Sequence, residues 1–297
     1  MYRLKRTLEN HPERVEFIRT LWVCVGGDLL VYPTAKDITY PTAYHDFIDI
    51  NIAIARWDIL PLVELVGDMS HVLTRLTIVA RKYQPGLRVF FQRTVFPKLE
   101  ELEAPVDMLT APDLPSNRIF GNLSLYPKLR KLRVSYDEEK YGAVDVFERQ
   151  DFTALAHLTH LYLSYYSHTE EEFRSIVCKI RIPPQVRVVV LEANAATQLP
   201  TSRWVLATHW FNPKVIVVAK PSALRDLHWS PTAEQHAKQL CLTLDPKTIR
   251  ETSIWALAEE KSLRRWELFV ERYTEDERKM LLSSPSLLVD RSKARNL

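Results

Sequence analysis

Apolar and polar positions repeat along the chain in one short phrase. An apolar residue is followed by two others, an apolar residue, one other and a third apolar residue, often after a proline-containing turn. Copies of the phrase, some of them weak, occupy residues 18–23, 73–78, 96–104, 126–134, 155–163, 186–190 and 215–218. From Leu76 to Val217 the middle apolar residue stands at positions 76, 102, 132, 161, 188 and 217. This nearly even spacing indicates a repeated structural unit.

Alternation within each copy predicts a short strand with a buried face. Several linking segments have helical spacing instead: residues 58–69 with a proline in the first turn, residues 144–156, and residues 170–179 after a capping box at 169–172. A strand followed by a helix or an irregular crossover, at this period, is typical of leucine-rich repeats. We therefore predict an α/β fold, a leucine-rich-repeat-like solenoid with parallel strands, over residues 1–220 in about seven to eight units.

The first step of the pattern is longer than the others. It runs from Leu21 to Leu76, which is about the length of two units. Every second residue from 48 to 54 is an isoleucine, and this alternation favours a strand. Phe47, Ile50, Ile54 and Trp57 would also line one face of a helix. We expect a degenerate extra unit in this segment, with the helix as the alternative.

Beyond about Ala219 the strand phrase gives way to helical spacing. A Ser-Pro pair at 230–231 and an Asp-Pro pair at 245–246 predict helix starts, and the longest helical stretch is 253–273. We predict a helical C-terminal cap over residues 221–282, because a bare last repeat would expose a sheet edge, and a disordered tail over 283–297. Four tryptophans in the last third of the chain are expected to pack the closing units: Trp204, Trp210, Trp255 and Trp266.

Composition narrows the function more than the fold. The 297 residues include 40 Lys and Arg against 37 Asp and Glu, and a net charge of +3 disfavours a dedicated nucleic-acid binder. Three widely separated cysteines are typical of reduced thiols in a cytoplasmic or nuclear protein. The first twenty residues are too charged for a signal peptide, and no apolar run approaches the ~20 residues of a membrane span.

No motif indicates catalysis or a bound metal. His157, His160 and His168 lie close in sequence, but no cysteine or acidic residue stands at a metal-like spacing from them. The glycine pair at 26–27 lacks the lysine of a phosphate-binding loop. No Gly-x-Ser-x-Gly occurs. We therefore expect a protein that is not an enzyme and that has no cofactor and no metal.

Alternation also predicts which strand residues point away from the buried face. We expect these residues to form a protein-binding surface on a concave strand face, with Trp22 and Tyr162 as aromatic anchors. Its charged residues would select a partner of complementary charge pattern. One line of this surface comprises Trp22, Thr77, Glu103, Arg133, Tyr162 and Arg187. A second, parallel line comprises Arg75, Glu101, Lys131, His160 and Ser164.

The opening residues 8–22, Leu-Glu-Asn-His-Pro-Glu-Arg-Val-Glu-Phe-Ile-Arg-Thr-Leu-Trp, resemble a known family. They are similar to the segment that follows the F-box in many fungal F-box and leucine-rich-repeat proteins. Residues 182–190, 212–218 and 254–260 look like that family's closing units and terminal helix, so the likeness extends over about residues 4–272. The resemblance implies a repeat region that recognises the substrate of an F-box-type ubiquitin ligase.

In that family the F-box binds a Skp1-type adaptor. The repeat-opening phrase begins so near Met1 that we expect no F-box within this chain, and a Skp1-type partner only if an F-box precedes Met1 in the full gene. Otherwise the chain is a stand-alone repeat protein. An alternative function is nucleic-acid association through basic residues near the C-terminus, although acidic residues are interleaved with them. These basic residues are Arg264, Arg265, Arg272, Lys279, Arg291, Lys293 and Arg295.

Overall fold

The computed structural model describes part of the chain, and every statement below concerns that part. The described residues are 2–25, 48–54, 60–80, 85–109, 125–135, 152, 155–165, 180, 182–193, 212–219, 242–243 and 253–283. They belong to two units. Unit 1 comprises Met1–Tyr136 and Ala154–Leu158, and unit 2 comprises Asp137–Thr153 and Thr159–Leu297.

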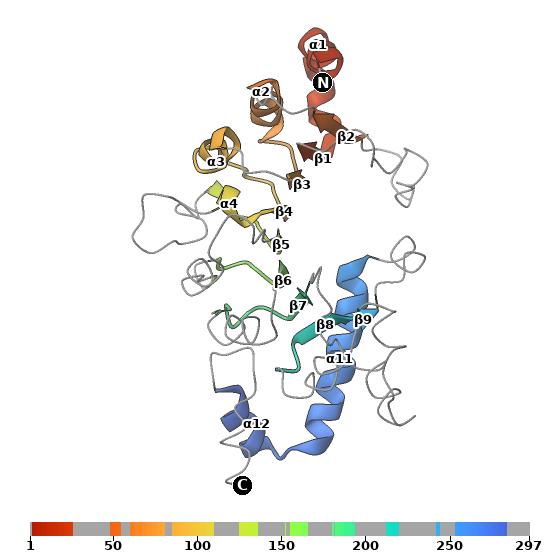
Figure 1. Cartoon of the computed structure of the whole chain (residues 1–297), viewed down its shortest axis with the longest axis vertical. Helices are drawn as coiled ribbons and strands as arrows, with labels where there is room; N and C mark the ends of the chain where they lie inside the picture. Colours follow the sequence, from red (N-terminus) through yellow and green to blue (C-terminus); the bar gives the residue numbers. More distant parts are fainter. Residues whose placement is uncertain are drawn as a thin grey trace. The chain divides into compact units, whose positions relative to one another are not determined.

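Unit 1 contains five described parallel strands with helices beside them. The strands are β1 (Ile18–Val25), β2 (Ile48–Ile54), β3 (Arg75–Ala80), β4 (Glu101–Pro105) and β5 (Lys131–Ser135). They run side by side in the order β2-β1-β3-β4-β5, and every pairing is parallel (Figure 1). The helices are α1 (Tyr2–Asn10), the 3-10 helix η1 (Pro12–Phe17), α2 (Leu60–Met69), α3 (Pro85–Phe91) and α4 (Val106–Leu109).

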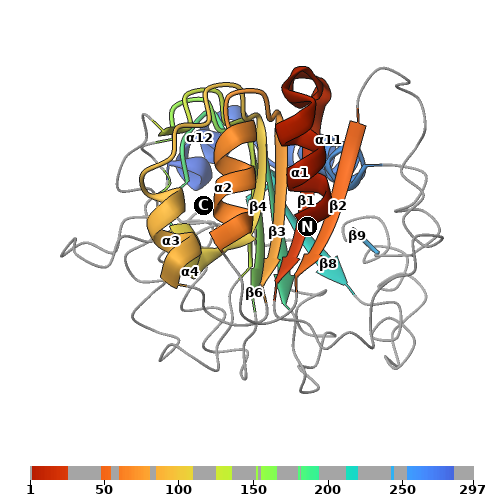
Figure 2. The same ribbon diagram turned by 90° about the horizontal axis from the view of Figure 1, so that it is seen from above.

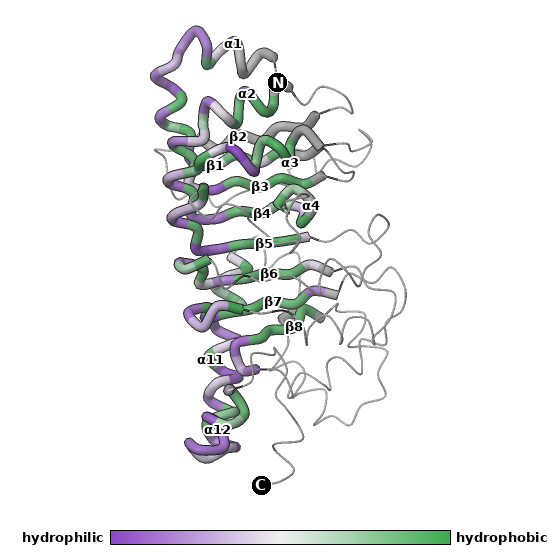
Figure 3. Tube along the Cα trace, turned by 90° about the vertical axis from the view of Figure 1, so that its left-hand side faces the viewer, coloured by the Kyte–Doolittle hydropathy of each residue, from purple (hydrophilic) through white to green (hydrophobic). Residues whose placement is uncertain are grey.

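A line of leucines forms the core of unit 1. Leu21, Leu76, Leu102 and Leu132 are partners in the strand register and are fully buried. Helices α2, α3 and α4 lie together on one side of the strands (Figure 2). At β3, β4 and β5 the chain is hydrophilic where it approaches the strand and hydrophobic further along it (Figure 3). Each fully buried leucine contributes about 1.5–3 kcal/mol relative to an exposed one, so this line stabilises the strand stack.

A turn of one kind directly precedes several of the strands, and it recurs with the predicted period. In unit 1 the backbone N–H of Leu99 donates to the carbonyl of Phe96, and the turns 126–129 and 155–158 have the same bond. In unit 2 the turns 183–186 and 212–215 have it too. The starts of these turns are therefore spaced almost evenly along the chain, as the sequence predicts. Four of the five carry proline in their second position, where its fixed φ suits a turn of this kind.

Two of these turns are joined by an aromatic stack. The rings of Phe96 and Tyr126, the first residues of their turns, are parallel with centroids 5.6 Å apart, and Phe91 stacks on Phe96 at 5.7 Å. The Tyr126 hydroxyl donates a 2.8 Å hydrogen bond to the carbonyl of Phe91. Burial raises the pKa of the Tyr126 phenol far above its ordinary value. The hydroxyl is therefore a permanent donor that ties α3 to the turn before β5.

The strands of unit 2 are parallel as well. They are β6 (His160–Tyr165), β7 (Val188–Ala193), β8 (Val215–Ala219) and β9 (Leu242–Thr243), and they lie in that order. Two helices follow: α11 (Ile254–Arg272) and α12 (Glu275–Leu282). Ser253 caps α11 by accepting a hydrogen bond from the N–H of Trp255. A capping box of Thr274 and Glu277 starts α12, and the hydrogen bonds from Thr274 lower the pKa of the Glu277 carboxyl.

The α/β class with parallel strands is confirmed, and so are the predicted strands and two helices. Residues 58–69 contain α2, and residues 253–273 contain α11. The isoleucine segment is a strand, as alternation predicts. The prediction that it forms an extra unit between the copies at 18–23 and 73–78 is wrong. β1 pairs directly with β3, and β2 lies on the other side of β1. Alternation predicts a strand and says nothing of which neighbour it pairs with.

Other predictions fall where the structure gives no test. The helix at 170–179, most of that at 144–156, the helix starts at 230–231 and 245–246, Trp204, Trp210 and the tail beyond 283 lie outside the described residues. The short helices α1, η1, α3, α4 and α12 were not predicted individually, although Thr274 to Glu277 has the capping-box pattern. Among the described helices, none has the length and apolar character needed to cross a membrane.

Tyr126→Phe tests the link between the turns. Removing the hydroxyl leaves the buried Phe91 carbonyl without this donor, so we expect the free energy of unfolding to fall by about 1–3 kcal/mol. Urea denaturation at neutral pH measures the change. Tyr273→Phe is the control, since that half-exposed hydroxyl makes no hydrogen bond among the described residues. Equal effects of the two substitutions would contradict a special role for the Tyr126 bond.

Candidate protein-binding surface

Four strands of unit 1 carry two lines of polar or aromatic side chains on one face. Trp22, Thr77, Glu103 and Arg133 are consecutive partners in the register of β1, β3, β4 and β5. The second line, two positions earlier in each of the last three strands, is Arg75, Glu101 and Lys131. The buried leucine line runs between them. We call these seven residues the ladder face; Arg75 is exposed and the other six are half-exposed.

Ion pairs cross between neighbouring strands of the ladder face. The Arg75 guanidinium lies 3.1 Å from the Glu101 carboxylate, and the Arg133 Nε lies 3.3 Å from the Glu103 carboxylate. The side chains retain between 22% and 46% of their exposure, so water and salt weaken both pairs. Each pair joins two long side chains from neighbouring strands.

Two members of the ladder face differ from the paired residues in the contacts that the described part of the chain makes with them. For the half-exposed Trp22 and Lys131, the structure gives no hydrogen bond, ion pair or ring contact of the side chain within the described part of the chain. Lys131 stands next to Glu101 in the register, yet Glu101 pairs with Arg75. The ladder face therefore offers one aromatic surface and one ammonium group beside a patterned set of charges.

In unit 2 the corresponding strand positions are covered. Counting from the turn, His160 and Val188 correspond to Glu101, and Tyr162 and Val190 correspond to Glu103. Helix α11 lies against this face of the unit 2 strands, where Trp255 and Ala258 join Tyr162 and the valines in one buried cluster. The expectation that His160 and Tyr162 lie on an open surface is therefore wrong: they are 6% and 0% exposed.

Arg187 also leaves the predicted line. It is exposed, but it precedes β7, and Val190 rather than Arg187 is the register partner of Tyr162. Val189 is accordingly the partner of Leu161, so the middle position of this copy is 189 rather than 188 and its phrase is shifted by one. A one-residue shift moves every side chain to the other face. From Val186 to Leu191 every residue except Arg187 is apolar, so the sequence alone does not determine this register.

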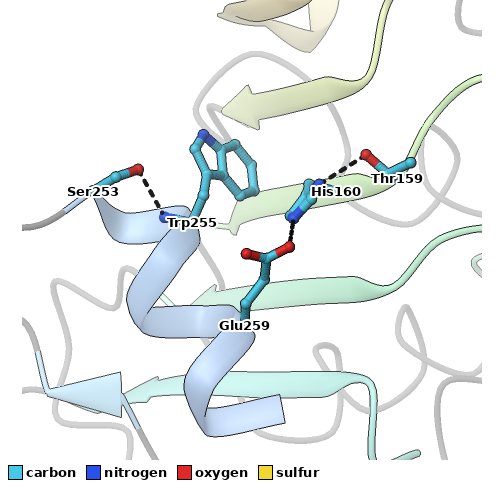
Figure 4. A network of polar contacts seen from close by, with 5 residues as sticks. All are labelled: Thr159, His160, Ser253, Trp255 and Glu259. Atoms are coloured by element: carbon cyan, nitrogen blue, oxygen red, sulfur yellow. Dashed lines mark hydrogen bonds and ion pairs between the residues drawn. The ribbon is translucent and has the colours of Figure 1, made fainter. Parts of the chain in front are cut away.

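A hydrogen-bonded chain fastens α11 to β6. His160 Nε2 lies 2.8 Å from Glu259 Oε1, and His160 Nδ1 lies 2.8 Å from Thr159 Oγ1 (Figure 4). The indole of Trp255 meets the imidazole edge-on, with centroids 5.5 Å apart, and meets the Tyr162 ring edge-on at 6.2 Å. The Tyr162 hydroxyl donates to the Glu192 carboxylate at 2.6 Å. The polar atoms of the buried His160 and Tyr162 rings therefore have partners.

The threonine, histidine and carboxylate in a row raise the question of catalysis. Here the threonine bonds to the histidine that follows it in the chain, and the imidazole lies buried against Trp255. We assign the chain of bonds to the attachment of α11. His157 is exposed, and His168 lies outside the described residues. No group of three His, Cys, Asp or Glu residues suited to a metal is present among the residues that the structure describes.

The basic residues of the C-terminal helices are largely engaged. Arg265 is buried, Arg264 contacts Glu267 at 2.8 Å, and Lys279 contacts Glu275 at 2.7 Å. The described part of these helices therefore gives no concentrated basic surface of the kind that binds nucleic acid. The basic residues at 291, 293 and 295 lie outside the described part.

Glu259→Ala tests the attachment of α11. The substitution leaves buried His160 Nε2 without its carboxylate, and we expect a loss of about 1 kcal/mol, at the low end of the usual range because Glu259 is half-exposed. Chemical denaturation followed by tryptophan fluorescence measures it. The matched control is Glu260→Ala, one residue further along the helix, exposed and with no ion pair among the described residues. If both variants lose the same stability, the bond does not hold the helix.

No protein-family model, curated protein or solved structure matches the chain. The likeness of about residues 4–272 to fungal F-box and leucine-rich-repeat proteins thus stays a prediction that rests on the phrases themselves.

Proposed function

We propose that this chain is a non-enzymatic protein-interaction module that captures a partner protein on the ladder face of unit 1. The observation that carries the proposal is the pair of polar lines over the buried leucines, with Trp22 and Lys131 at positions open to a partner. Tryptophan is enriched among residues that dominate binding energy, and fixed charges give an interface its specificity.

The proposed partner segment has a definite chemistry. The charged members of the ladder face are three cations, Arg75, Lys131 and Arg133, and two carboxylates. Both carboxylates are already paired with arginines, so the ammonium of Lys131 is the charge that a partner is expected to answer. A carboxylate opposite Lys131 and an apolar group against the Trp22 ring would satisfy both. The partner segment is therefore acidic with an apolar anchor.

The wider proposal is a leucine-rich-repeat-like solenoid that acts as the substrate-recognition part of an F-box-type ubiquitin ligase receptor in the cytoplasm or nucleus. Its support is the turn that recurs at nearly even spacing between residues 96 and 215, and the resemblance of the opening phrase to repeat regions of that class. In this proposal a Skp1-type adaptor binds an F-box and not the ladder face. No observation on the described residues favours the nucleic-acid alternative.

The double variant Trp22→Ala/Lys131→Glu tests partner capture by the ladder face. Affinity purification with the full chain as bait, followed by quantitative mass spectrometry, compares the variant with the unaltered protein. We expect recovery of the partners of the unaltered chain to fall about tenfold or more, since losing an aromatic anchor and reversing a charge together cost at least about 1.4 kcal/mol. Thermal unfolding verifies that the variant is folded.

The matched control is Lys128→Glu, which makes the same charge reversal at an exposed turn position of unit 1 that is not on the ladder face. It should keep the full set of partners. An unchanged partner set for the folded double variant would show that the ladder face does not bind. An equal loss of partners with Lys128→Glu would show that the effect comes from the change in net charge and not from the ladder face.

A further inference from the structure

Helix α11 exposes three large apolar side chains on one flank. Leu263, Trp266 and Val270 retain 62%, 38% and 40% of their exposure. At about 100° of rotation per residue, positions i, i+3 and i+7 lie within one narrow stripe of a helix. We call this stripe the apolar flank. It adjoins the side of α11 that Trp255, Ala258 and Phe269 bury.

The packing beneath the apolar flank holds its tryptophan in place. The Trp266 ring contacts the Phe269 ring at 5.9 Å, and Phe269 contacts Tyr273 at 5.1 Å. Phe269 in turn packs against Leu281 of α12. An exposed tryptophan that is already supported by a packed neighbour loses less side-chain entropy when a partner covers it. The flank is thus pre-organised for an apolar contact.

The charges beside the apolar flank are mainly acidic. Glu260 precedes Leu263 by one turn, Glu267 directly follows Trp266, and Glu271 directly follows Val270, so all three border the stripe on one side. All are at least half-exposed. The basic residues Lys261 and Arg272 lie about half a turn away from the stripe, by the same geometry. An apolar contact here is therefore accompanied by a negative border, which is softened where Arg264 pairs with Glu267 and where the Arg278 guanidinium donates to the carbonyl of Val270.

We propose that the apolar flank of α11 docks an amphipathic helix of a partner protein whose apolar side is bordered by lysine or arginine. The three apolar residues match the i, i+3, i+7 anchors by which two helices meet along a shared seam. The acidic border selects a cationic helix over an acidic one. This site belongs to unit 2 and is independent of capture by the ladder face.

The test uses a fluorescent synthetic Leu/Lys amphipathic peptide of about five turns, with a Leu/Glu peptide of the same apolar pattern for comparison. Fluorescence anisotropy with the full chain should show saturable binding of the Leu/Lys peptide, and about tenfold weaker binding of the Leu/Glu peptide. Leu263→Ser/Val270→Ser should weaken Leu/Lys binding about tenfold or more. Glu260→Lys/Glu271→Lys should weaken it too and reduce its salt dependence.

The control variant is Val89→Ser/Val95→Ser, which removes two valines of similar exposure from unit 1 and should bind the Leu/Lys peptide as the unaltered chain does. Absence of binding, equal binding of both peptides, or equal losses in the two serine variants would overturn the proposal. Sedimentation equilibrium provides the remaining outcome. A dimer that Leu263→Ser/Val270→Ser abolishes would overturn it by assigning the flank to a second copy of this chain.

Discussion

Each parallel strand of this protein has two faces, and the side chains of each face must either tolerate water or be buried away from it. One face is fixed by the leucine-type positions, which are buried in every described strand from β3 to β8. The other face has two stable solutions: polar side chains that tolerate water, or apolar side chains under a covering element. The chain uses the first solution in unit 1 and the second in unit 2. Most features of the molecule described above follow from that difference.

In unit 1 the polar solution leaves the side chains that the proposed partner would contact. Two strand-to-strand ion pairs fix the charges, and Trp22 and Lys131 are left available beside them. In unit 2 the apolar solution requires α11, whose Trp255 packs on the strands while the Glu259 carboxylate meets buried His160. The exposed apolar flank of the same helix adjoins the side that covers the strands.

Sequence alone predicts the periodic part of the fold well. Turn, strand and buried leucine recur at nearly fixed distances, so β3, β4 and β5 and their outward lines follow from alternation. Alternation does not predict that α11 covers Tyr162. It shows on which face of the strand a side chain lies, and it says nothing about what packs against that face. A signal was present. β7 and β8 read Val-Val-Val-Leu and Val-Ile-Val-Val, and continuous apolar runs are typical of strands that are buried on both faces.

Solvent access to the two strand faces is the quantity on which the account depends most directly. Hydroxyl-radical footprinting of the full chain, read residue by residue by mass spectrometry, measures it without any substitution. The account predicts ready oxidation of half-exposed Trp22 and strong protection of Tyr162 and Trp255, which are buried under and within α11. Oxidation of Tyr162 and Trp255 at the rate of Trp22 would contradict it, because the unit 2 face would then be as open as the ladder face.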